Sequence, residues 1–310
     1  MPNPHIASSF PDLTELTATF TDIFNERFKV EARSPDELYR VVNNKSINTR
    51  YSTVSGMGQL EQFTGSVTYG DVSQGYDMTL TPVQFQRGFS LERLLAETDQ
   101  HDIMNGKPRA LGGAAARTRN IHIFRPYNNA FTVDTLFASH SEGVALCSNS
   151  HTTTTGASTA TGFDNLVTTA LSAVAVASAR VQGLNFRDEQ GEKIDTLKFD
   201  RIRVPQQGNM EEIAWEIVNS GGKWDTALNN ANFNKGKYTV DPEIYLDDAN
   251  NWFMEDSMMR KDIGLIWQEA TPPEFAMVED FDTLIAKWRC YGRWGNYWQG
   301  WPWVIGAQVS

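Results

Sequence analysis

The sequence has little cysteine, no long apolar run and no targeting segment, and each shortage excludes a class of protein. Only Cys147 and Cys290 occur among 310 residues, which is too few for a disulfide framework, and neither lies in a metal-binding cluster. No apolar run approaches the roughly 20 residues that span a bilayer. Residues 1–10 lack the basic start and apolar stretch of a signal peptide. We therefore expect buried, reduced thiols in a chain that is neither inserted into a membrane nor exported by a signal.

The sequence also lacks the common catalytic and metal-binding motifs. It contains no Gly-x-Ser-x-Gly elbow, no phosphate-binding Gly-Lys-Ser/Thr loop and no dinucleotide fingerprint. None of its five histidines forms a His-x-x-x-His or Glu-x-x-His pair, which would place two ligands on one helical face: His5, His101, His122, His140, His151. The adjacent acids Glu211-Glu212 and Asp247-Asp248 point apart, which suits solvation or helix capping better than a shared proton. We predict no catalytic residue, no metal and no cofactor, and therefore a protein that is not an enzyme.

Charge is unevenly distributed along the chain. The net charge of −11 argues against a protein that finds nucleic acid by its overall field. Two stretches are nevertheless locally basic, because no acid occurs between Ile103 and Val133 or after Asp282. The first stretch holds five cations: Lys107, Arg109, Arg117, Arg119, Arg125.

The middle of the chain predicts one layered unit of helix, strand and helix. A helix capped by Asp164 and ended by Gly183 is indicated by apolar residues that recur every three to four positions: Val167, Leu171, Val174, Val181. Residues 197–204 predict a strand. Residues 209–220 predict a second helix, with Asn209 as its cap and acids in the first turn.

The flanking segments differ in composition. Residues 12–28 carry a helical apolar stripe, whereas residues 46–89 are rich in Thr, Ser, Gly and Gln and hold few residues suited to a core. Turns and short strands there predict an extended hairpin that something else must cover, although an ordinary surface hairpin is the alternative. Pro108 suits the first turn of a helix that reaches about Phe124, and the small residues 112–116 predict close approach to another backbone.

The last 30 residues alternate between apolar and polar positions. One apolar face is predicted to contain Leu284, Ala286, Trp288, Cys290, Trp294. We expect a turn at residues 295–300 and a return strand to Val309, so that a hairpin packs on the helix after Pro108. Residues 263–267 predict a further strand. Because five of the nine tryptophans fall between Trp288 and Trp303, a carbohydrate-binding module is an alternative of a different class, although the alternation favours burial.

Several of these features occur together in one known family. The motif Gly143-x-x-Leu146-x-Ser148-x-x-His151 is followed by a helix, a strand ending in Val-Pro, and a short helix. This order, together with the later stretches 245–248 and 251–254, resembles the major head (capsid) proteins of tailed bacteriophages. The resemblance is to the Mu-like head-subunit branch of the Hong Kong 97-type capsid fold.

The resemblance implies an α+β fold with an N-terminal arm, an extended loop, a long spine helix, and peripheral and axial domains. The implied boundaries are 1–45 for the arm, 46–89 for the extended loop, 90–131 with 265–310 for the peripheral domain, and 132–264 for the axial domain. Arm and loop would contact neighbouring subunits through Phe20, Phe24, Phe63, Tyr69, Tyr76, Met78. The residues expected to face DNA are Lys107, Arg109, Arg117, Arg119.

The implied function is self-assembly of hexamers and pentamers into an icosahedral head shell around double-stranded DNA. Expected partners are copies of the same chain, a separate scaffolding protein, a portal, decoration proteins and packaged DNA, with no membrane. The expected location is the virion, after assembly in the host cytoplasm. An encapsulin-like cellular compartment is the alternative within this fold. No lysine occurs between Ser46 and Glu92, so Lys–Asn cross-linking of the kind known in one branch of the family cannot use this loop.

Overall fold

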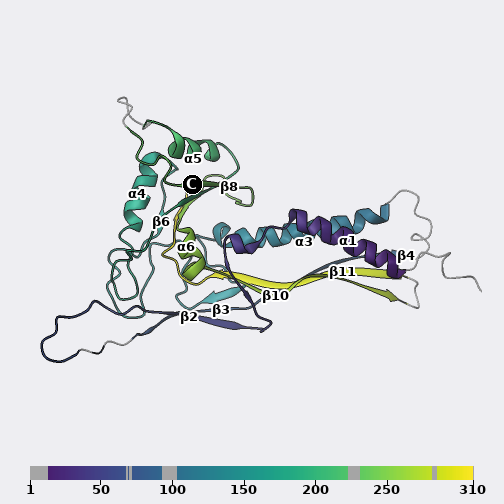
Figure 1. Ribbon diagram of the computed structural model, residues 1–310, viewed down its shortest axis with the longest axis horizontal. Coiled ribbons are helices and arrows are strands. Elements are labelled where there is room, and N and C mark those ends of the chain that lie inside the picture. Colours follow the sequence, from purple (N-terminus) through teal and green to yellow (C-terminus); the bar gives the residue numbers. More distant parts are fainter. Residues whose placement is uncertain are drawn as a thin grey trace, which may run out of the picture.

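The computed structural model describes residues 13–67, 69, 72–92, 103–222, 231–280 and 285–309. Three parts are visible in Figure 1: a long flat limb of two helices on a sheet, a head of mixed helices and strands, and a loop that projects beyond the head. The C-terminus lies in the head, so the last residues of the chain leave the limb.

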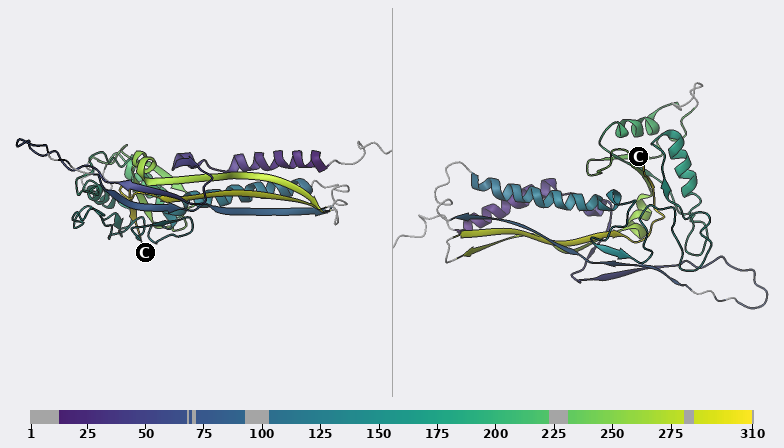
Figure 2. Two further views of the ribbon diagram at one scale, coloured as in Figure 1. Left: turned by 90° about the horizontal axis from the view of Figure 1, so that it is seen from below. Right: turned by 180° about the vertical axis from the view of Figure 1, so that it is seen from behind.

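A four-stranded sheet forms the limb, in the order β1-β10-β11-β4. Its strands are β1 (Arg40–Asn43), β10 (Leu265–Asp280), β11 (Ile285–Trp298) and β4 (Val83–Glu92). The helices α1 (Leu13–Glu31) and α3 (Ile103–Asn128) lie side by side along one face of this sheet (Figures 1 and 2). The predicted alternation is confirmed over β11, where the buried residues face the helices: Ala286, Trp288, Cys290, Trp294. Leu284, which was predicted on the same face, lies outside the described residues.

The prediction that β11 pairs with the last residues of the chain in a hairpin is wrong. β11 pairs antiparallel with β10 and with β4, whereas the return strand β12 (Val304–Ala307) joins the sheet of the head. Gly295 serves close packing inside β11 rather than a turn, because a Cβ there would lie 3.2 Å from Pro82 Cα. The strand predicted at 263–267 is present, but it is the start of the 16-residue β10.

The helix predicted from Pro108 to Phe124 is longer and starts earlier. α3 runs for 26 residues and contains Pro108. The predicted close approach is confirmed: a Cβ on Gly112 would lie 2.7 Å from the carbonyl oxygen of Phe24, so only glycine lets α1 pack this closely. Residues 90–92 continue strand β4.

The head is built on a five-stranded sheet in the order β6-β12-β9-β7-β8. The strands not yet given are β6 (Leu166–Val167), β9 (Trp252–Glu255), β7 (Arg201–Pro205) and β8 (Thr239–Glu243). Its helices are α4 (Ala173–Gly183), α5 (Met210–Asn219) and the short α6 (Ser257–Met259), which leads into a π-helical turn at Arg260–Gly264.

Two of the three elements predicted for the head, the first helix and the strand, begin at later residues than predicted. α4 starts at the cap Ser172, whose hydroxyl accepts a hydrogen bond from Ala175 N at 3.1 Å, and not at Asp164. The reason is that Leu166 and Val167 pair with β12 instead of forming a helical turn. β7 begins at Arg201 rather than at 197, while α5 follows Asn209 as predicted.

The projecting loop grows from a small sheet of β2 (Thr49–Val54), β3 (Gln74–Leu80) and β5 (Ala138–His140). β2 and β3 form the base of a hairpin, and the chain between residues 55 and 73 runs outward beyond the head (Figure 1). The strand β4 lies within the predicted loop 46–89 but belongs to the limb, so the hairpin ends at Leu80.

Candidate assembly surfaces

The projecting loop carries exposed apolar side chains along its length. Phe63 is 70% exposed and Tyr69 is 92% exposed. The other large apolar residues that the structure exposes there are Val54, Met57, Leu60, Val67, Val72. A soluble monomer seldom concentrates so much apolar surface on one narrow segment, and such surface marks a site of contact with another molecule.

The base of the loop, by contrast, is tied to its own head. Gln59 Nε2 donates to Glu192 Oε2 at 2.7 Å, and Gln190 Nε2 donates to Ser55 Oγ at 3.1 Å. The hydroxyls of Tyr76 and Thr152 lie 2.5 Å apart. Only the part of the loop beyond these contacts is free to reach another molecule.

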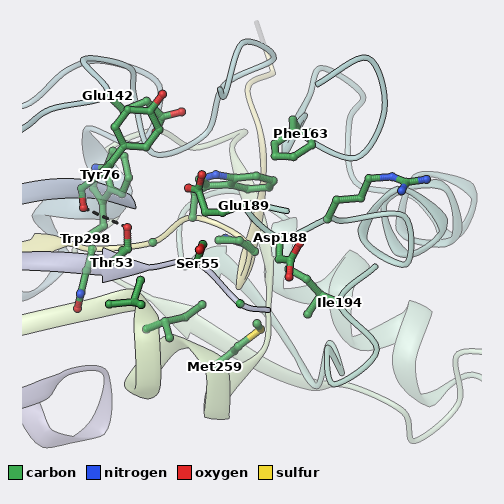
Figure 3. Close-up of a pocket in the computed structure, with 18 of the residues that line it drawn as sticks. Thr53, Ser55, Tyr76, Glu142, Phe163, Asp188, Glu189, Ile194, Met259 and Trp298 are labelled. Atoms are coloured by element: carbon green, nitrogen blue, oxygen red, sulfur yellow. Dashed lines mark hydrogen bonds between the residues drawn. The ribbon is translucent and has the colours of Figure 1, made fainter. Parts of the chain in front are cut away.

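A pocket of about 450 Å³ lies between the loop base and the head (Figure 3). Its apolar wall includes Phe163, Trp298 and Met259, and carboxylates such as Glu142 and Glu189 lie at its rim. Burial and then the neighbouring Glu142 raise the pKa of Glu189, although Thr154 N donates to its carboxylate. This pocket marks the place where the hairpin of the loop meets the head.

The basic helix α3 presents its cations in different environments. Arg109 and Arg117 are exposed, and Lys107 Nζ donates to the carbonyl oxygen of Ser90 at 3.3 Å. Arg119 instead faces the sheet, where its two terminal nitrogens donate to the two carboxylate oxygens of Glu269 at 2.7 Å each. The solvent face of α3 therefore carries fewer cations than the sequence suggests, because Arg119 is paired inside the limb.

A buried ionic network joins the limb to the head. Glu255 accepts hydrogen bonds from Arg203 Nε at 2.7 Å, Tyr127 Oη at 2.7 Å and Arg260 Nη1 at 2.5 Å. Arg260 Nη2 also donates to the carbonyl oxygen of Glu37 at 2.9 Å. Burial would raise the pKa of Glu255, but Arg203 and Arg260 outweigh it and lower this pKa to about 2. We call these four side chains, Tyr127, Arg203, Glu255 and Arg260, the junction network.

A second buried pair orders the segment after β5. His151 Nδ1 lies 3.0 Å from Glu142 Oε1, both side chains are nearly fully buried, and the His151 ring stacks on Trp301 at 4.5 Å. The same carboxylate oxygen accepts from Thr152 N at 2.8 Å. The histidine of the sequence motif therefore has a structural role in this fold.

The tryptophans of the last strands are buried rather than displayed. None of the five from Trp288 to Trp303 is more than 7% exposed: Trp288, Trp294, Trp298, Trp301, Trp303. A sugar ring cannot stack on an indole that its own chain covers, so this burial contradicts the carbohydrate-binding alternative. Both cysteines are free and buried as expected, and burial raises the thiol pKa of Cys290 to about 11.

The described residues hold no group of three or more His, Cys, Asp or Glu side chains able to bind a metal ion. No helix in the described part of the chain has both the length and the apolar character needed to cross a membrane.

This chain is similar to known proteins in its structure and not detectably in its sequence. No protein-family model and no curated protein matches the sequence. Among solved structures, the mature capsid of bacteriophage PhiM1 matches with a TM-score of 0.58 at 10% identity, over 89% of this chain and 87% of that chain. Mycobacterium phage Patience matches with a TM-score of 0.57 at 9% identity, over 95% and 88% of the two chains. A virus-like particle from Pyrococcus furiosus matches with a TM-score of 0.51 at 8% identity, over 94% and 98%.

The chain has the Hong Kong 97-type capsid fold. The predicted α+β class is thereby confirmed. Within this fold the limb corresponds to the expected combination of spine helix and strands, and the projecting hairpin to the expected extended loop.

Three of the six predicted intersubunit residues are covered by their own chain. Phe20 and Phe24 are at most 1% exposed; Phe20 packs on Trp288, and Phe24 stacks on Phe275. Met78 is fully buried in the core. This burial contradicts the prediction that these three residues contact a neighbour, and the apolar stripe of α1 instead fixes that helix to its own limb.

The other predicted site residues lie on two separate surfaces. Phe63 and Tyr69 are exposed on the loop, and Tyr76 is partly exposed at its base. Among the four residues predicted to face DNA, Arg119 is paired inside the limb, which contradicts its predicted role. The junction network was not predicted, although an arginine between Ile202 and Val204, and a glutamate after three apolar residues, are sequence signs of buried charge.

Proposed function

We propose that this chain is the major capsid protein of a tailed bacteriophage, which self-assembles into the icosahedral shell of the head. The observation that supports this most strongly is a capsid fold that covers nearly all of the chain, combined with a projecting loop whose large apolar side chains, such as Phe63 and Tyr69, are exposed. The protein does no chemistry in this proposal; its activity is the formation of repeated contacts.

Assembly works through repetition of a few surfaces. Each subunit offers the same surfaces to several neighbours in rings of six and five, so contacts that are weak singly give a stable shell together. The loop supplies one such surface, with Phe63 and Tyr69 as contacts to the adjacent subunit, whereas Tyr76 is partly buried and held to its own head through Thr152. The exposed rings of Phe63 and Tyr69 provide large contact area with little conformational freedom to lose.

The exposed cations of α3 suit contact with the packaged genome. Lys107, Arg109 and Arg117 lie on a helix without any acidic residue, and in the described structure no ion pair occupies them. Contacts of this kind bind phosphates without reading sequence and weaken as salt rises. The acidic balance of the whole chain keeps free subunits soluble and limits such binding before assembly.

The structure suggests adjusted boundaries for the units of the shell subunit. We propose an arm at 1–45, an extended loop at 46–82, a peripheral domain at 83–131 with 265–298, and an axial domain at 132–264 with 299–310. β4 and β12 are the reasons for the two changes.

The remaining proposals concern relatives and partners. Within the capsid fold, the motif from Gly143 to His151 favours the Mu-like head-subunit branch. A separate scaffolding protein, a portal and decoration proteins complete the expected set of partners, in a virion that is assembled in the host cytoplasm.

The test is assembly of the purified full-length chain. Sedimentation velocity and negative-stain electron microscopy, at rising protein concentration and with scaffolding protein where it is needed, should show rings and closed shells. A chain that stays monomeric under all these conditions would contradict the proposal.

A cellular compartment is the second candidate, because the fold also matches a virus-like particle from Pyrococcus furiosus over 98% of that chain. The two candidates differ in content. Particles isolated from the native source should hold double-stranded DNA in a phage head, and protein cargo without a genome in a compartment.

A further inference from the structure

Helix α4 has exposed apolar side chains on its outer face. Its inner face is buried in the head through Ala175, Val176 and Ala179. Its outer face carries Val174 and Val181, which are 59% and 52% exposed, together with the exposed Ser178. Large apolar side chains grouped on an exposed face mark a site of contact with another molecule, so the outer face of α4 is a candidate contact surface.

The apolar band of α4 continues onto a neighbouring loop and carries two cations. Phe233 is 58% exposed, with the Arg180 guanidinium 4.8 Å and Lys237 Nζ 2.9 Å from its ring centroid. Among the ion pairs of the described residues, none joins Arg180 or Lys237 to a carboxylate. We define the α4 patch as Val174, Arg180, Val181, Leu184, Phe233 and Lys237.

Helix α5 has the complementary character. It buries Met210, Ala214, Ile217 and Val218, whereas its solvent face carries a single large apolar residue, Trp215, which is 61% exposed. Glu211 and Glu212 lie four and three residues before Trp215, which places both carboxylates beside the indole. Neither carboxylate has a cation partner among the described ion pairs. We define the α5 patch as Glu211, Glu212 and Trp215.

We infer that the α4 patch of one copy packs against the α5 patch of the next copy, in a head-to-tail contact around each ring. This inference rests on the proposed shell function and names one of its contacts. The apolar band receives Trp215, while Glu211 and Glu212 neutralise Arg180 and Lys237. Charge complementarity points to a second copy of this chain as the partner, because each copy carries a cationic α4 patch and an anionic α5 patch.

The position and the residue types fit such a contact. Both helices lie on the outside of the head, away from the limb (Figure 1). Exposed tryptophan and arginine are the residue types that most often dominate the binding energy of an interface. A contact between two different patches is heterologous, and its repetition closes a ring when the rotation allows.

The first test breaks each patch separately in the full-length chain. Val181→Asp disrupts the α4 patch and Trp215→Ala the α5 patch, and since both side chains are more than half exposed, the subunits should melt at the wild-type temperature. Each variant should need at least about tenfold more protein than the wild type to assemble in sedimentation velocity. Met258→Asp is the matched control: Met258 is 82% exposed on α6, outside both patches, and its variant should assemble as the wild type does.

The second test asks whether the two patches meet each other. The Val181→Asp chain keeps its α5 patch and the Trp215→Ala chain keeps its α4 patch. An equimolar mixture should therefore form a 1:1 dimer that neither variant forms alone. A mixture with no species larger than its components would overturn the pairing of α4 with α5.

The outcomes separate this inference from the proposed function. If the wild type assembles and both variants assemble at the wild-type concentration, the contact is wrong while the shell proposal stands. If the wild type itself never assembles, both proposals fall.

Discussion

The junction between limb and head and the tip of the extended loop use side chains in opposite ways. At the junction, three segments far apart in sequence bury a glutamate, two arginines and a tyrosine, with every charge paired inside one chain. On the loop, the rings of Phe63 and Tyr69 are exposed, whereas the base of the loop is hydrogen-bonded to the head through Ser55 and Gln59. The junction is complete in the single subunit, whereas in the proposed shell a neighbouring molecule covers the loop.

This difference separates the free energy of unfolding of the subunit from the free energy of association between subunits. Changes at the junction should alter the stability of the isolated subunit, whereas changes at the loop should alter association and leave the subunit intact. The proposed shell function needs both, because a rigid body must carry its contact surfaces at fixed positions.

The largest effect should come from Glu255→Gln at the junction. The change leaves Arg203 and Arg260 buried without their carboxylate, and breaking a buried pair on one side costs about 3–5 kcal/mol. Urea unfolding of the dissociated subunit measures this loss. Glu26→Gln, at an exposed position of α1, is the control and should change the free energy of unfolding by less than about 0.5 kcal/mol.

Acid should remove the same stabilisation in the wild type. The pKa of Glu255 is lowered from 4.5 to about 2, so its contribution is present above pH 4.5 and is lost as the pH falls through about 2. Linkage makes this contribution about 3 kcal/mol. The difference in unfolding free energy between wild type and Glu255→Gln should therefore shrink between pH 4.5 and pH 2. A constant difference over this range would contradict the role of the carboxylate.

A smaller effect is expected where the limb pairs α3 with its sheet. Arg119→Ala leaves Glu269, which is 12% exposed, without its bidentate partner, and we expect a loss of about 1–3 kcal/mol. Arg117→Ala, two residues earlier on the solvent face, should cost less than about 0.5 kcal/mol. Equal losses from the two variants in urea unfolding would mean that the structure assigns the wrong arginine to the interior.

The loop should show almost no effect on the stability of the subunit. The double variant Phe63→Ser/Tyr69→Ser removes two exposed rings, so the free energy of unfolding should change by less than about 0.5 kcal/mol. Assembly should nevertheless need at least about tenfold more protein, because the rings supply contact area to the neighbour. Light scattering over a concentration series measures this; unchanged assembly would remove the loop from the proposed contacts.

The smallest effect on the subunit should come from Arg109→Glu/Arg117→Glu. Both side chains are exposed, so stability and shell formation should be unchanged. Retention of short double-stranded DNA by the assembled shell should fall, and the fall should be greatest at low salt, because phosphate contacts weaken as salt rises. Equal retention by wild type and variant would remove α3 from the proposed genome surface.

The sequence predicts what is local in this molecule. The helix after Asn209 follows from its first-turn acids and apolar spacing, whereas the predicted cap is wrong in its contact, since the Asn209 side chain makes no capping hydrogen bond. The alternation of β11 follows from the period of a strand. The overall fold also follows, because the order of motifs around Gly143 and His151 resembles that of a known family.

Partners distant in sequence explain most of the errors. Leu166 and Val167 leave the predicted helix because Gly306 and Ala307 pair with them from the far end of the chain. Alternation in β11 does not reveal that β10, rather than the last residues, is its neighbour. Arg117 and Arg119 cannot be told apart in the sequence, because the partner of Arg119, Glu269, lies 150 residues further along the chain.

The spacing of apolar residues also does not tell whether a given side chain is exposed in the folded subunit. Phe20 belongs to an apolar stripe that suits a core and an interface equally well, and only the position of Trp288 decides for the core. Val181 belongs to the apolar spacing that predicts the helix, but the spacing does not tell that the folded chain leaves this side chain 52% exposed.

Hydrogen exchange of the assembled particle against the dissociated subunit tests the central claim most directly. We predict that the amides of residues 60–67 exchange freely in the subunit and become protected in the particle, while those of β7 and β9 are protected in both. Equal exchange of residues 60–67 in the two states would show that no neighbour covers the loop, and the account would be wrong.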